Sequence, residues 1–108
     1  MIVILSRLTA VPGRRADLLA AFDELHDAVA GEAGTEIFAM HVARDDADAV
    51  VFYEVYRDDA ALAEHRESPA VEALVARLDD LVAAPPEIIY LSPVRSKGLP
   101  PDASLRTE

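Results

Sequence analysis

Apolar and polar residues alternate with a period of two in some segments of this chain and recur at helical spacing in others. The clearest strand pattern is residues 50–56 (VVFYEVY), where every residue except Glu54 is β-branched or aromatic. A period of two places three of these side chains on one face: Phe52, Glu54 and Tyr56. A carboxylate between two aromatic side chains must find a hydrogen-bond partner, reach water in a cavity or shift its pKa. We therefore expect this face to carry ligand-contacting residues.

Three further segments are predicted to be strands. Residues 2–11 are strongly apolar and end at a Pro-Gly pair, residues 35–43 (TEIFAMHVA) form the second strand, and residues 87–94 (EIIYLSPV) form the last. The acidic stretch 45–48 is a polar turn between the second and third strands. These two strands should form a hairpin.

Helices are predicted where apolar residues recur every three or four positions. The first runs from Arg14 to about Ala30. A short helix follows the third strand and is capped by Asp58 or Asp59. Ser68 and Pro69 begin the last helix, because Ser is a favoured N-cap and Pro fits the first helical position. Its predicted buried stripe is Val71, Leu74, Val75, Leu78 and Leu81.

The predicted order β-α-β-β-α-β is that of a ferredoxin-like α+β fold, with an antiparallel four-stranded sheet and helices on one face. Residues 1–94 form this single domain. The tail, residues 95–108, is polar and is either mobile or packed on a partner subunit. The third strand is apolar on both faces, so Val51, Tyr53 and Val55 on the open face should meet a second copy. We expect a homodimer, a dimeric α/β barrel joined through the open sheet face.

Composition narrows the classes of partner and compartment. The 108 residues include 20 acidic and 10 basic side chains, and the net charge of -10 disfavours nucleic acid as a partner. The apolar runs are too short to cross a membrane, and the first residues do not resemble a signal peptide, so we expect a cytoplasmic protein. With no cysteine, disulfides and thiolate metal sites are excluded.

The sequence also predicts that no cofactor is needed. The histidines lack the spacings H-x-H and H-x-x-x-H that place two metal ligands together, with His41 on a strand and His26 on the outer part of a helix. The four glycines never form a G-x-G phosphate loop, so nucleotides and flavin are not expected. We predict neither a metal site nor a bound organic cofactor.

Four stretches carry a family resemblance: residues 7–13 (RLTAVPG), 31–41 (GEAGTEIFAMH), 52–69 (FYEVYRDDAALAEHRESP) and 84–94 (APPEIIYLSPV). Together they resemble the antibiotic biosynthesis monooxygenase superfamily, dimeric α+β barrel proteins that include small quinol monooxygenases. The most specific part is a pattern with Glu, an aromatic residue two positions later, then His and a Ser/Thr-Pro pair. The resemblance covers nearly all of residues 1–94.

This resemblance implies a pocket between the sheet and the helices. It also implies oxygenation of anthrones or quinols without metal or flavin, haem degradation, or isomerisation of a small sugar derivative. Glu54 and His65 match residues of the quinol monooxygenase branch, and Tyr56 stands where many members have Trp.

The departures from the family pattern narrow these activities. Ser6 replaces an Asn that functions in haem-degrading members, so haem degradation is disfavoured. Phe52 and Leu62 replace an Asn and a Tyr of an anthrone-oxygenating member, and Ala70 replaces a His common in the branch.

His65 is the candidate general base. It lies three residues after Leu62, so both share a helix face that should look toward the sheet. A neutral imidazole, with a reference pKa of about 6.5, could take a proton from a phenol or hydroquinone. Alternatively, His65 bonds Glu54 or a backbone carbonyl and only ties the helix to the sheet.

Glu54 is the second candidate catalytic residue. It could orient His65 or accept a substrate hydroxyl directly, and the alternative is a structural salt bridge to Arg7 or Arg66. The predicted substrate-binding residues are Tyr56, Phe52, Ser6, Leu62 and Phe38. Aromatic residues at strand spacing more often belong to the hydrophobic core than to a ligand site.

Two functions are therefore expected from the sequence. The first is a cofactor-independent monooxygenase of a quinol-like or polycyclic phenolic molecule, an oxidoreductase that uses O₂. The second is an isomerase or tautomerase using the same His65, or a small-molecule-binding protein of the same fold. Because the chain has no Asn, Gln or Trp, proton transfer is easier to assign than oxygen handling.

Overall fold

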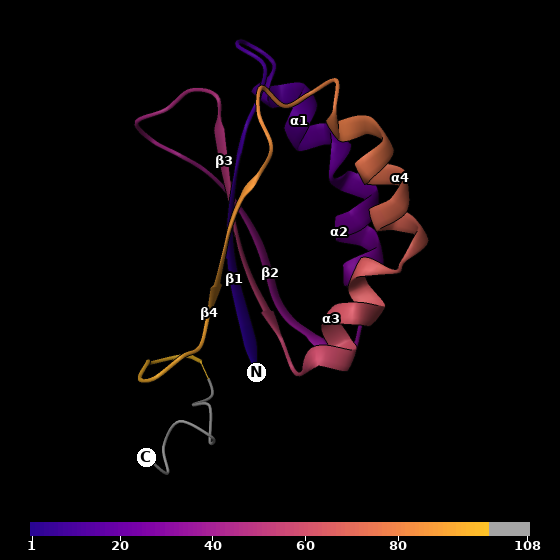
Figure 1. The fold of residues 1–108 in the computed structure, drawn as a ribbon, viewed down its shortest axis with the longest axis vertical. Helices are drawn as coiled ribbons and strands as arrows, with labels where there is room; N and C mark the ends of the chain where they lie inside the picture. The colour runs from indigo at the N-terminus through magenta and orange to yellow at the C-terminus, as the bar shows by residue number, and fades with distance from the viewer. Residues whose placement is uncertain (100–108) are drawn as a thin grey trace.

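The computed structural model describes residues 1–99, which form one antiparallel sheet covered on one side by helices (Figure 1). The elements in chain order are β1 (Ile2–Thr9), α1 (Arg15–Ala21), α2 (Asp23–Val29), β2 (Thr35–Val42), β3 (Ala49–Tyr56), α3 (Asp59–Arg66), α4 (Pro69–Leu78) and β4 (Glu87–Leu91). The sheet order is β2-β3-β1-β4. With each helix pair counted as one unit, the predicted ferredoxin-like α+β fold is confirmed. The tail beyond residue 99 lies outside the described residues.

One predicted helix is in fact two. The segment from Arg14 to Ala30 is interrupted at Phe22, which has φ -88° and ψ -2°. Its N–H donates to the carbonyl of Leu19 at 3.1 Å, a tight i→i−3 bond that ends the regular α-helical pattern. The Phe22 ring packs on Phe52 of the sheet, with centroids 4.6 Å apart. The break therefore occurs at an aromatic anchor between the helix layer and the sheet.

The caps of α3 and α4 form as expected. Asp58 accepts a hydrogen bond from the N–H of Ala61 at 2.8 Å, and Ser68 accepts from Val71 at 3.3 Å. The buried stripe of α4 is narrower than predicted, since Val75 is 58% exposed while Leu74 is buried. Val75 is the next residue after Leu74, about 100° further around the helix, and its side chain is exposed.

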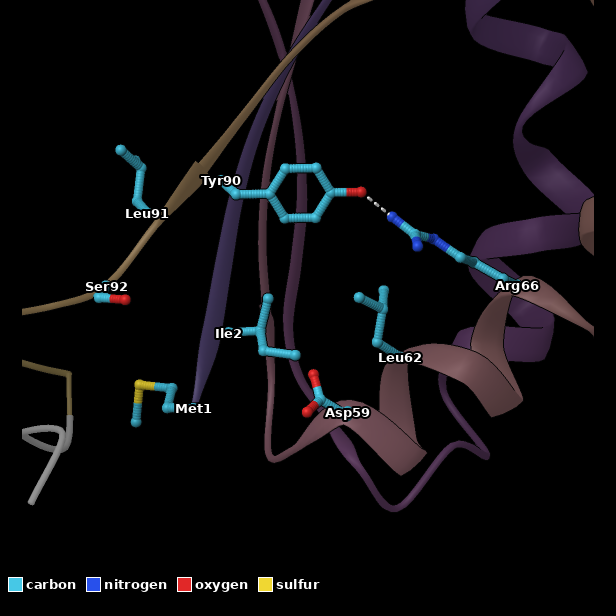
Figure 2. A pocket seen from close by; sticks show the side chains of 8 residues that line it. All are labelled: Met1, Ile2, Asp59, Leu62, Arg66, Tyr90, Leu91 and Ser92. Carbon is cyan, nitrogen blue, oxygen red and sulfur yellow. Dashed lines mark hydrogen bonds between the residues drawn. The ribbon is translucent and has the colours of Figure 1, made fainter. Parts of the chain in front are cut away.

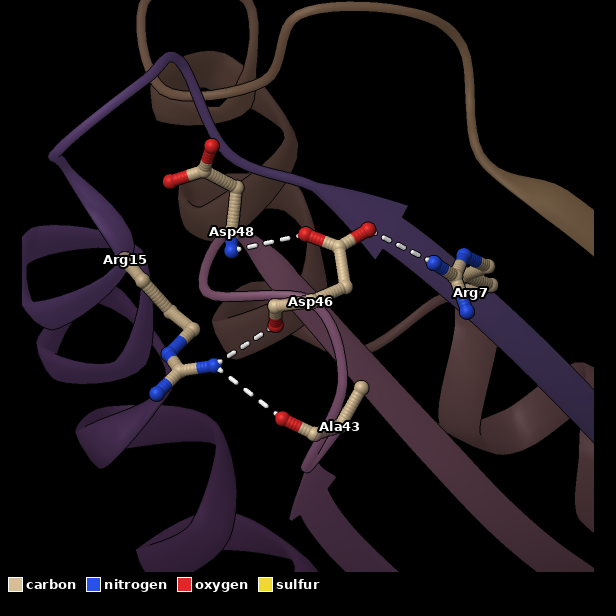
Figure 3. A network of polar contacts seen from close by, with 5 residues as sticks. All are labelled: Arg7, Arg15, Ala43, Asp46 and Asp48. Atoms are coloured by element: carbon tan, nitrogen blue, oxygen red, sulfur yellow. Dashed lines mark hydrogen bonds and ion pairs between the residues drawn. The ribbon is translucent and has the colours of Figure 1, made fainter.

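The predicted hairpin between β2 and β3 is held by a polar network (Figure 3). Arg7 of β1 donates to the carboxylate of Asp46 at 2.8 Å, and the other oxygen of Asp46 accepts from the backbone N–H of Asp48 at 3.0 Å. Arg15 of α1 donates to the carbonyls of Asp46 and Ala43. Two elements, β1 and α1, are thereby tied to one turn, and Arg7 is engaged far from Glu54.

Strand register brings residues from distant parts of the chain together on the helix-facing side of the sheet. Ser6 pairs with Phe52 on one side and with Ile88 on the other. Two residues after Phe52, on the same face of β3, Glu54 pairs with Phe38 of β2. These rows form the sheet side of the space between the two layers.

The open face and β4 remain partly uncovered in the single chain. All five residues of β4 are exposed, and Ile89 and Leu91 are 53% and 43% exposed on the open face. Tyr53 is half-buried, whereas Val55, predicted to face a partner, is fully buried. Val55 is a small side chain in a central strand, flanked by its strand neighbours Val3 and Ile37. No helix of the described residues is long and apolar enough to span a membrane.

Candidate functional site

A cavity of about 220 Å³ lies between the sheet and the helices. Five of the seven predicted site residues line it: Ser6, Phe38, Phe52, Glu54 and His65. The rest of its wall is apolar and comes from both layers: Leu8, Phe22, Leu25, Val71, Leu74, Leu78, Pro86 and Ile88. Such a wall with a few polar groups is typical of a small-molecule site.

Ser6 and the aromatic residues form the sheet side of this cavity. Phe38 and Phe52 have ring centroids 5.5 Å apart. Ser6 is 8% exposed, and no described side chain or backbone group forms a hydrogen bond with its Oγ. Its hydroxyl is therefore available to a ligand as donor or acceptor.

His65 enters the cavity from α3 and is held by a carboxylate that the sequence did not indicate. Its Nδ1 lies 2.9 Å from Oε1 of Glu32, and the same oxygen accepts from Thr35 Oγ1 at 2.7 Å. The imidazole is also packed between the rings of Tyr56 and Phe38, with centroids 5.1 and 5.5 Å away. In a neutral imidazole that donates its Nδ1 proton to Glu32, the lone pair is on Nε2.

Glu32 lies in the loop between α2 and β2, 33 positions before His65. Turn bonds fix this loop: the N–H of Glu32 donates to Val29, and the N–H of Thr35 donates to Glu32. Gly34 is buried there, and a Cβ at this position would lie 2.4 Å from Cβ of Ala61 in α3. Only glycine allows the loop to approach α3 so closely, which places Glu32 beside His65.

Glu54 contacts neither His65 nor an arginine. Its Oε1 accepts a hydrogen bond from the hydroxyl of Tyr56, two residues along the same strand face. The expected orientation of His65 by Glu54 is therefore replaced by Glu32, and the expected salt bridge to Arg7 or Arg66 does not form. Glu54 also lines the cavity.

Tyr56 is fully buried and does not line the cavity. Burial raises the pKa of its phenol far above the usual value, and the hydrogen bond and negative charge of Glu54 raise it further. Tyr56 thus stays protonated and acts as a donor that holds Glu54. Leu62, also predicted to bind substrate, packs with Tyr56 and Ile4 in a second core cluster outside the cavity.

The remaining histidines do not add a metal site. His26 was predicted to face outward, but its ring packs edge-on against Phe38 at 5.1 Å, and its Nε2 is buried with no partner among residues 1–99. It turns inward because α2 presents it to the β2 side of the sheet. His41 is exposed and binds the carbonyl of Val51. Within the described residues, no group of three or more His, Asp or Glu side chains could hold a metal ion.

The sequence profile of the antibiotic biosynthesis monooxygenase family matches residues 1–77, which is most of the chain. The chain belongs to the antibiotic biosynthesis monooxygenase family. The match includes β1, β2, β3 and α3, and so includes Ser6, Glu32, Glu54 and His65. Membership of this family indicates a function of the monooxygenase class.

Solved structures of similar proteins have the same fold. The chain is 26% identical to Rv0793 of Mycobacterium tuberculosis, with a TM-score of 0.81, over 88% of this chain and 96% of that one. It is also 26% identical to PA3566 of Pseudomonas aeruginosa, with a TM-score of 0.77, over 83% and 90% of the two chains. A structure titled as an antibiotic biosynthesis monooxygenase has the same fold at 20% identity, with a TM-score of 0.80, over 88% and 100% of the two chains. No curated protein matches the sequence.

Proposed function

We propose that this protein is a cofactor-independent monooxygenase that oxidises a hydroquinone of one or two rings with O₂. The observation that supports the proposal is the His65 imidazole, whose Nδ1 lies 2.9 Å from Oε1 of Glu32 and which lines a largely apolar cavity. We infer that Nε2 of this imidazole acts as the base. Membership of the monooxygenase family adds the reaction class.

In the proposed reaction, Nε2 of His65 takes a proton from one substrate hydroxyl. The second oxygen of Glu54, or the hydroxyl of Ser6, holds the other substrate oxygen. The resulting phenolate gives an electron to O₂ far more readily than the neutral phenol does. Recombination forms a ring hydroperoxide, whose O–O bond breaks as a ring C–H proton is lost. One oxygen atom stays on the ring and the other leaves as water, so the four electrons taken up by O₂ all come from the substrate.

The volume of the cavity limits the substrate. An apolar cavity of about 150 Å³ accommodates one benzene molecule, and the cavity beside His65 measures about 220 Å³. A substituted single ring or a compact two-ring quinol suits this volume better than a three-ring anthrone. The cavity volume therefore favours one-ring and two-ring quinols over the polycyclic phenols that the sequence also predicted.

The function is tested with menadiol, the two-ring quinol, and the purified protein. We expect oxygen consumption above the rate of spontaneous oxidation, one O₂ per quinol, and a quinone product with one added hydroxyl group in mass spectrometry. Plain two-electron oxidation to menadione at the rate seen without protein would contradict the proposal.

Proton transfer without oxygen is the second candidate function. It is favoured by the absence of Asn, Gln and Trp from the chain, because amide donors to hold a substrate oxygen are missing. An isomerase or tautomerase with the same His65 would turn over a keto–enol substrate equally well under nitrogen. Tight binding with no turnover in either atmosphere would instead indicate a small-molecule-binding protein.

We further propose that the active form is a homodimer joined through the open sheet face. The exposed apolar side chains of Ile89 and Leu91 on that face support this arrangement. Sedimentation velocity at micromolar concentration should give about twice the 11.7 kDa chain mass. A single monomeric species would contradict it.

A further inference from the structure

A second cavity, of about 480 Å³, lies between the N-terminal end of β1, the far end of β4 and α3. It shares no lining residue with the cavity beside His65: its wall consists of Met1, Ile2, Asp59, Leu62, Arg66, Tyr90, Leu91 and Ser92 (Figure 2). Its volume is within the range of about 300–1,000 Å³ that is usual for small-molecule sites. Nothing in the proposed monooxygenase reaction uses it.

Two hydrogen-bond donors converge at one end of this cavity. Arg66 donates an N–H to the hydroxyl oxygen of Tyr90, and its guanidinium carbon lies 5.6 Å from the centre of the Tyr90 ring (Figure 2). Because that oxygen accepts from Arg66, the phenolic O–H is free to donate elsewhere. The other guanidinium N–H groups have no acceptor among residues 1–99. Together they suit a ligand with two adjacent acceptor oxygens.

The charge of Arg66 is uncommitted although the chain is strongly acidic. Arg7, Arg14 and Arg57 each pair with an aspartate, whereas Arg66 pairs with no carboxylate in the described part of the chain. Asp59 lines the same cavity but lies at the opposite end of α3. It is seven residues before Arg66, a separation of about 10 Å along the helix axis. Asp59 therefore leaves the guanidinium free and repels an anion at its own end, which orients a bound anion toward Arg66.

The floor between these two charges is apolar. Ile2 and Leu62 lie between Asp59 and the Arg66–Tyr90 pair (Figure 2), and Leu62 is 7% exposed. Arg66 and Tyr90 themselves are exposed, so a ligand can reach them from solvent. Ile2 and Tyr90 lie on the helix-facing side of the sheet, so a dimer formed through the open face would leave these donors accessible.

We infer that this cavity binds a small carboxylate carried on an apolar or aromatic body. The carboxylate accepts from the Arg66 guanidinium and the Tyr90 hydroxyl, and the body rests on Ile2 and Leu62. The Arg66 guanidinium and the Tyr90 hydroxyl together match the charge and planar shape of one carboxylate, and the apolar floor selects against inorganic anions.

Binding is tested by NMR titration of the ¹⁵N-labelled protein with sodium benzoate, benzamide and inorganic phosphate at equal ionic strength. We expect benzoate to shift the amide signals of residues 59–66 and 90–92, and to bind at least about tenfold more tightly than benzamide or phosphate. Equal affinities for benzoate and benzamide, equal affinities for benzoate and phosphate, or shifts confined to other residues would overturn the inference.

Matched variants locate the donors. Arg66→Gln removes the charge, and Tyr90→Phe removes the hydroxyl donor. Arg77→Gln removes an exposed charge near the end of α4, where no ion pair forms among residues 1–99. The first variant should weaken benzoate binding at least about tenfold and the second severalfold, while Arg77→Gln leaves it unchanged. Unchanged binding in Arg66→Gln, or equal weakening by Arg77→Gln, would contradict the assignment whether or not the protein oxidises quinols.

Discussion

Replacement of His65 by Gln should lower kcat/KM for menadiol oxidation by about 10²- to 10³-fold. Gln has a similar reach and can still donate to Glu32, which keeps the loop and α3 together. It offers no basic nitrogen to the cavity, so the substrate must lose its proton to water. Initial rates of oxygen uptake, corrected for spontaneous oxidation of the quinol, measure the effect.

His41→Gln provides the matched control, because His41 is exposed on β2 and does not line the cavity. It should oxidise menadiol at the rate of the unmodified protein. Raising the pH should partly rescue His65→Gln, since more of the quinol is then ionised before it binds. Equal rates for His65→Gln and the unmodified protein at neutral pH would exclude His65 as the base.

Replacement of Tyr56 by Phe should lower the free energy of unfolding at neutral pH by about 2 kcal/mol. Phe fills the same space but leaves the half-buried carboxylate of Glu54 without its hydrogen-bond donor, and a partly desolvated acceptor that loses its partner is costly. For a domain with a total stability of about 5–15 kcal/mol this is a substantial loss. Urea unfolding of both proteins measures it.

The difference in the free energy of unfolding between the unmodified protein and Tyr56→Phe should also depend on pH. The pKa of Tyr56 is raised in the folded state, so folding keeps a proton that the unfolded chain releases above about pH 10. The stability contributed by the Tyr56 hydroxyl is therefore complete below that pH and decreases above it. Tyr56→Phe lacks this loss, so the gap between the two proteins should narrow above about pH 10. Tyr53→Phe, on the opposite face, should show neither effect, and a pH-independent gap would contradict the role of Tyr56.

Much of the fold could be predicted because its signals are local. Period two in residues 50–56, the Asp58 and Ser68 caps and the turn near Asp46 each depend on neighbours in sequence. The break at Phe22 could not be predicted, since the helical spacing continues through it and the ring of Phe22 packs on Phe52, which belongs to another element.

The candidate site was predictable only in part for the same reason. Strand alternation and family resemblance together placed Phe52, Glu54 and His65 at one cavity. The partner of His65 is Glu32, which is 33 positions away in a loop with no periodicity, and its position depends on the close approach of Gly34 to Ala61. Glu54, the carboxylate that the sequence analysis expected to orient His65, instead accepts a hydrogen bond from Tyr56.

Glu32, Gly34 and His65 belong to the α2–β2 loop and to α3. Half of the apolar residues in the cavity wall come from α4, β4 and the segment between them: Val71, Leu74, Leu78, Pro86 and Ile88. The group proposed to move the proton and this half of the wall are thus encoded in separate parts of the chain. Substitutions in this half of the wall can alter which molecule fits without changing the Glu32–His65 pair. The architecture therefore allows substrate preference to diverge among related sequences while one proton-transfer unit is retained.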